Sequence, residues 1–176
     1  MPIVSTAVGA GIAFAGTMVA DLGRARGQRR REQELDRWQH GIDFLVALDA
    51  AHGLLREVAR SRPDPGELPA AVAEAMGESG LYGAREKLLI AGTPQVVRAA
   101  EVVVGRLVAI RNAVRSGATL DSRSYHDAYH DYAESLWAFR MVVRKGFGHR
   151  TIAPSDLDRP DWSERAHCRV CAADGS

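Results

Sequence analysis

Residues 93–117, TPQVVRAAEVVVGRLVAIRNAVRSG, decide the fold class because they place an amphipathic helix between two boundary signals. Thr93 can cap this helix, Pro94 suits its first turn, and a serine–glycine pair ends it. Gly92 suits the left-handed position at the end of a preceding helix. The apolar residues recur at three- and four-residue spacing, which places them on one helix face. They are Val97, Ala100, Val104, Leu107, Ile110 and Val114.

The segment that follows has the same character. Asp121 or Ser122 can cap a second long helix, and glycines at 146 and 148 can end it. One face of this helix is rich in tyrosine and other apolar side chains. That face carries Tyr125, Ala128, Tyr129, Tyr132, Leu136, Phe139 and Val143.

Upstream, residues 30–60 contain no proline and predict a further long helix, in which Asp49 and His52 interrupt the apolar stripe. Three prolines in 61–69 predict a linker. No segment alternates as a strand would. We therefore predict an all-α protein in which residues 24–148 form an antiparallel three- to four-helix bundle.

The composition narrows the function classes. The chain has 176 residues, of which 46% are hydrophobic, and a formal net charge of +1. Such a balance is typical of a globular protein and gives no global attraction to nucleic acid. No phosphate-binding loop or nucleophile motif is present, so we predict a non-enzymatic protein with no cofactor and no identified small-molecule substrate.

The N-terminus predicts a membrane anchor. No charged side chain occurs from Pro2 to Ala20, a length of roughly 28 Å as a helix, and a bilayer core is about 30 Å thick. Basic residues follow at once and favour the cytoplasmic side, where they can contact lipid. They are Arg24, Arg26, Arg29, Arg30 and Arg31. We expect residues 1–23 to span the bilayer once, with the N-terminus outside and the bundle in the cytoplasm.

Three alternatives to a spanning helix remain open. A cleavable signal peptide would carry positive charge before the apolar run, a helix lying flat on the membrane would show a polar face, and a soluble core helix would need neither. Within a span, small residues at Ala7, Gly11 and Ala15 share one face and allow close helix packing. This spacing is consistent with self-association.

Two segments carry a resemblance to known proteins. Residues 88–101, LLIAGTPQVVRAAE, and the tyrosine-rich helix ending at Phe147-Gly148 resemble recurring segments of small actinobacterial membrane-anchored helical proteins of unknown function. The layout is also similar to that of the kil-type membrane proteins that Streptomyces plasmids use for spread. The resemblance implies a membrane address and a helical domain, and the second likeness implies a role in plasmid transfer or spread.

His126 and His130 lie four residues apart, a spacing that can bind zinc from one helix face. The metalloprotease motif requires glutamate where Asp127 stands, and Glu134 is a conceivable third ligand. The alternative is that this face, with Asp131, is simply solvated.

The C-terminal residues 149–176 contain few branched apolar side chains and predict a flexible tail, with Trp162 as a possible contact. Cys168 and Cys171 form one CxxC pair there. Because structural zinc normally takes four ligands, His149 and His167 could complete a set. Unused, reduced cysteines are the alternative.

These observations favour a non-enzymatic, membrane-anchored interaction or scaffold protein that contacts itself or another protein. The alternatives are a metal-binding protein or metalloenzyme that uses the two helix histidines, and a soluble helical bundle with no membrane role.

Overall fold

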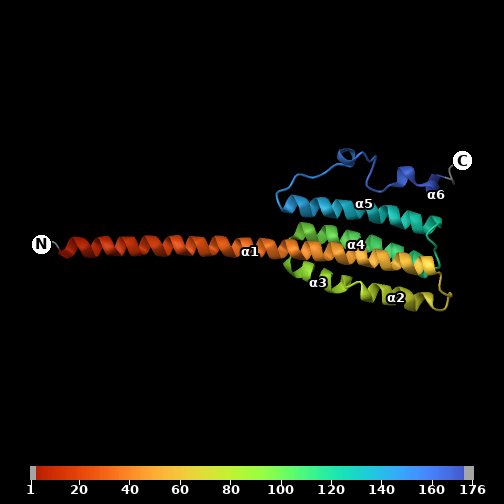
Figure 1. The fold of residues 1–176 in the computed structure, drawn as a ribbon, viewed down its shortest axis with the longest axis horizontal. Helices are drawn as coiled ribbons and strands as arrows, with labels where there is room; N and C mark the ends of the chain where they lie inside the picture. Colours follow the sequence, from red (N-terminus) through yellow and green to blue (C-terminus); the bar gives the residue numbers. More distant parts are fainter. Residues whose placement is uncertain (1–2, 173–176) are drawn as a thin grey trace. The chain divides into compact units, whose positions relative to one another are not determined.

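The computed structural model describes residues 3–172, and it describes side chains from residue 26 onward except that of residue 30. Regular structure in this range is entirely helical, which confirms the all-α prediction (Figure 1). The long helices are α1 (Ile3–Ser61), α2 (Leu68–Glu78), α3 (Leu81–Ala91), α4 (Pro94–Arg115) and α5 (Arg123–Gly146). The C-terminal residues add two 3-10 turns, η1 (Pro154–Leu157) and η2 (Arg165–His167), and the short helix α6 (Arg169–Ala172).

The chain divides into two compact units, Met1–Arg37 and Trp38–Ser176. The second unit begins at Trp38. The predicted bounds of the bundle, residues 24–148, stay a prediction. The predicted anchor, residues 1–23, lies outside the described side chains. So do its predicted packing residues and two of the arginines, namely Ala7, Gly11, Ala15, Arg24 and Arg30.

The remaining arginines of the predicted lipid-contacting cluster, Arg26, Arg29 and Arg31, are exposed. Among the described residues, no helix combines the length and apolar character that crossing a bilayer requires. The membrane anchor therefore stays a prediction.

The core of the second unit lies between the C-terminal half of α1 and helices α2–α5, with α4 and α5 packed along each other. Phe44 of α1 meets Phe139 of α5 edge to face, with ring centroids 5.3 Å apart. The Tyr132 hydroxyl donates to the Leu48 carbonyl oxygen at 3.4 Å, which links the same two helices. Fully buried apolar side chains from all five of these helices form this core, among them Leu48, Leu55, Val72, Leu81, Leu107 and Ile110.

The predicted boundaries of the two amphipathic helices are confirmed, with one correction. The Thr93 hydroxyl accepts a hydrogen bond from the Val96 backbone N–H at 3.4 Å, and the Ser122 hydroxyl accepts one from the Tyr125 N–H at 3.3 Å. Gly92 is not left-handed, since its φ is −74°. A side chain is excluded there for another reason, because a Cβ would lie 2.5 Å from the Leu88 carbonyl oxygen.

The C-terminal segment, defined here as residues 149–172, is not the flexible tail that the sequence predicts. It follows α5 on the outer side of the bundle (Figure 1). Trp162 is only 8% exposed, and its indole stacks on Trp137 of α5 with centroids 4.2 Å apart. A buried aromatic side chain thus helps to attach a segment that composition alone marks as polar.

Candidate metal centre

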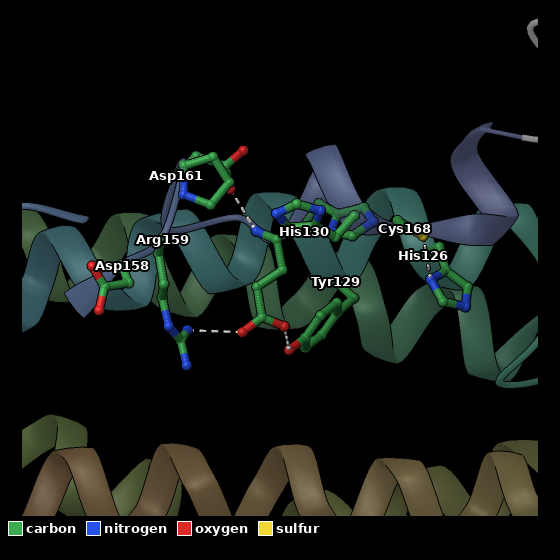
Figure 2. Close-up of a pocket in the computed structure, with 10 residues that line it drawn as sticks. His126, Tyr129, His130, Asp158, Arg159, Asp161 and Cys168 are labelled. Carbon is green, nitrogen blue, oxygen red and sulfur yellow. Dashed lines mark hydrogen bonds and ion pairs between the residues drawn. The ribbon is translucent and has the colours of Figure 1, made fainter. Parts of the chain in front are cut away.

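Two histidines of α5 and one cysteine of the C-terminal segment come together on the outer face of α5 (Figure 2). His126 and His130 are one helical turn apart, with ring centroids separated by 6.0 Å. Cys168 directly follows η2 and lies beside the two histidines. One ligand atom from each residue, two ring nitrogens and a thiol sulfur, lies within 4.8 Å of the other two.

His130 is the most constrained member of the group. Its side chain is 2% exposed, and its Nδ1 lies 2.6 Å from the Ser163 carbonyl oxygen. Because a carbonyl only accepts, Nδ1 carries the proton and the Nε2 lone pair is free. Nε2 is buried and has no hydrogen-bond partner among the described residues. A metal-bound histidine has the same arrangement, with the second ring nitrogen held by a carbonyl.

Cys168 and Cys171 differ in their surroundings. Cys168 Sγ lies 3.2 Å from His126 Nδ1. Burial acts to raise the pKa of this thiol, but a hydrogen bond from the Cys171 backbone N–H lowers the pKa by more. Burial and the neighbouring Cys168 raise the pKa of Cys171, whose Sγ lies 4.0 Å from Asp127 Oδ1. Cys168 is therefore the thiol better suited to bind metal as a thiolate.

Ion pairs hold the C-terminal segment against α5 beside this group. Arg165 contacts the carboxylates of Asp127 and Asp131 at 3.1 and 3.4 Å, and Asp127 also pairs with Arg123 at 2.9 Å. Desolvation raises the pKa of Asp127, but the two guanidinium groups lower it by more. The Asp127 carboxylate is thus engaged with arginines, unlike the free base of a metalloprotease.

A cavity of about 420 Å³ opens beside the three ligand atoms. Its walls include Tyr129 of α5 and Arg159, Asp158 and Asp161 of the C-terminal segment (Figure 2). Glu164 of that segment also lines the cavity. The Tyr129 hydroxyl donates to one Glu164 carboxylate oxygen at 3.4 Å, and Arg159 donates to the other at 2.8 Å. Burial, and then the Glu164 carboxylate, raise the pKa of Tyr129.

The structure brings together three of the four predicted metal-site residues, His126, His130 and Cys168. Cys171 lies beside them but outside the group. The solvated-face alternative is wrong for His130, because the Ser163 carbonyl covers it.

Of the other predicted ligands, Glu134 and His149 are exposed and do not join the group, while His167 lines the cavity. Sequence reasoning missed Ser163, Arg159 and Glu164. No spacing signal marks them, because they act through a backbone carbonyl or line a cavity formed by chain segments far apart in sequence.

Comparisons with protein-family models, with curated proteins and with solved structures find no match for this chain.

Proposed function

We propose that this chain is a metal-binding helical protein in which one transition-metal ion fastens the C-terminal segment to α5. The buried Nε2 of His130 carries the proposal, because it has no hydrogen-bond partner among the described residues while Nδ1 is held by a carbonyl. A buried polar atom without a partner is costly unless something binds it.

The donor set favours zinc. Two imidazole nitrogens and a thiolate are ligands that Zn²⁺ takes in tetrahedral sites, at about 2.0–2.3 Å from the metal. Such bonds place neighbouring ligand atoms roughly 3.5 Å apart. The three atoms here lie within 4.8 Å of one another, so small rotations of His126 and Cys168 suffice to bring them onto one ion.

Metal titration of the full chain tests this proposal. Protein freed of metal with a chelator should bind one equivalent of Zn²⁺ in competition with a chromophoric chelator. His126→Ala and Cys168→Ser should each weaken binding at least tenfold, because each removes a ligand. His149→Ala is the matched control, since this exposed histidine lies outside the group. The proposal would be overturned if the wild-type chain bound no stoichiometric Zn²⁺. It would also be overturned if His126→Ala and Cys168→Ser both kept the full affinity for Zn²⁺.

The variants also test the fastening role. Zn²⁺ should slow hydrogen exchange in residues 161–172 of the normal chain and not in Cys168→Ser. Equal protection with and without the ion would show that the ion does not hold the segment.

The N-terminal sequence supports a second proposal, that the chain is a non-enzymatic, single-pass membrane protein with a cytoplasmic bundle. What supports it is the uncharged run from Pro2 to Ala20 with basic residues directly after it. The bundle would then present its surface to a protein partner or to a second copy, and plasmid transfer or spread is one physiological version.

Cell fractionation tests this second proposal. The full chain should stay in the membrane pellet after carbonate extraction, and a chain that starts at Arg24 should be released. Release of both would contradict it.

A further inference from the structure

The three-member group leaves the fourth coordination position of the proposed metal ion unassigned. This inference rests on the proposed metal centre. Zinc bound by only three protein ligands keeps a fourth position for water or another molecule, whereas a closed structural site fills it with a protein side chain. Cys171 is the obvious protein candidate, because it follows Cys168 in the CxxC pair.

The geometry places Cys171 beside the group, next to the Cys168 thiol, but not within it. Its Sγ lies beside Asp127 Oδ1, at 4.0 Å, and it does not join the atoms that lie within 4.8 Å of one another. It is also absent from the walls of the 420 Å³ cavity, whereas His126, His130 and Cys168 all line it. Of the two neighbouring cysteines, Cys168 therefore borders the cavity and joins the ligand group, and Cys171 does neither.

The cavity lies directly beside the proposed metal position, so an external ligand could reach the ion through it. All three proposed ligands border it, and Figure 2 shows their side chains beside the Arg159 and Tyr129 side chains that form another part of its wall. Its volume of about 420 Å³ falls in the range of small-molecule sites, roughly 300–1,000 Å³.

Both the ion and the walls contribute charge at this position. A divalent ion with one thiolate and two neutral imidazoles keeps a net positive charge, while the cavity walls carry the carboxylates of Asp158, Asp161 and Glu164 and one guanidinium, that of Arg159. We infer that the metal keeps one coordination position open to this cavity, where water binds and a small monodentate donor molecule can replace it.

Cobalt substitution of the full chain tests the inference, because Co²⁺ takes the zinc geometry and its visible spectrum reports the ligands. Azide is the probe. We expect azide to shift the visible bands of the Co²⁺ protein in a saturable way, in the normal chain and in Cys171→Ser alike. Cobalt affinity in Cys171→Ser should stay within about threefold of normal.

A spectrum that azide does not change, together with at least a tenfold loss of cobalt affinity in Cys171→Ser, would overturn the inference and define a closed site with Cys171 as fourth ligand. Either result alone also counts against an open position. The proposed function survives these outcomes, because cobalt is still bound. If the wild-type chain binds neither cobalt nor a stoichiometric amount of zinc, both the inference and the proposed function are overturned.

Discussion

The indole of Trp162 stacks on the indole of Trp137, with ring centroids 4.2 Å apart and ring planes inclined by 16°. Trp137 belongs to α5 and Trp162 to the C-terminal segment, so this pair joins the segment to the bundle. Neither indole lines the cavity beside the proposed metal ligands. The segment therefore has an apolar attachment as well as the proposed metal.

Trp162→Ala should loosen the C-terminal segment while the bundle stays folded. Truncation of a buried tryptophan costs about 3 kcal/mol, and here the loss falls on the segment alone. Hydrogen exchange in residues 159–172 should rise at least tenfold, with little change in the melting temperature of the bundle. Leu157→Ala, at an exposed position, is the control. Unchanged exchange in the segment would contradict this prediction.

His52 should make the bundle less stable in mild acid. Its Nε2 lies 3.2 Å from the Tyr125 hydroxyl, and its pKa falls to about 4, first because it is buried and then because of Arg56, with Asp49 opposing. In the unfolded chain the pKa is about 6.5. The unfolded state therefore binds more protons between pH 6.5 and 4, and the free energy of unfolding falls across that range by at most about 3 kcal/mol.

Denaturation at several pH values measures this effect. His52→Gln keeps a polar partner for Tyr125 but does not titrate, so the difference between the two proteins isolates the histidine. A difference that stays constant from pH 7 to 4 would show that His52 titrates normally.

Ser122, and not Asp121, should stabilise the start of α5. The Ser122 hydroxyl accepts the Tyr125 N–H, whereas the Asp121 carboxylate lies 4.0 Å from Arg62 on the surface. Ser122→Ala should cost about 1 kcal/mol, and Asp121→Ala much less. Urea denaturation of the two variants compares them directly, and the reverse order would assign the cap to Asp121.

Gly92 and Gly105 should respond to alanine in opposite ways. At Gly92 a Cβ would lie 2.5 Å from the Leu88 carbonyl oxygen, so Gly92→Ala should destabilise the α3–α4 junction. Gly105 lies inside α4, and a Cβ added there would meet nothing within 4 Å, so Gly105→Ala should stabilise the protein by about 1 kcal/mol. Thermal melting distinguishes them, and a loss of stability in both would contradict the prediction for Gly105.

Helices α4 and α5 were predictable because their information is local. Thr93 and Ser122 mark the starts, and the apolar spacing of residues such as Leu107 and Phe139 assigns the buried face without knowledge of the partner helix. The helical class and the two caps follow from these signals.

The C-terminal segment was not predictable in this way. Its attachment depends on Trp162 and on the Ser163 carbonyl, which meet α5 residues more than twenty positions away. Periodicity could not reveal that His130 is covered, nor that Cys168 turns toward it while Cys171 turns toward Asp127. The sequence shows which residues could bind a metal, and only the fold shows which of them lie close together.

The contact between Cys168 and His126 joins positions 42 residues apart. An ion held by both side chains would close that stretch of polypeptide into a ring in the folded protein only, because a metal site rarely persists in the unfolded chain. Its contribution to stability would therefore depend on the concentration of the free ion, and would reach about 2.7 kcal/mol at a hundredfold excess over the Kd. A chelator would then open the ring, which a disulfide does only with a reductant.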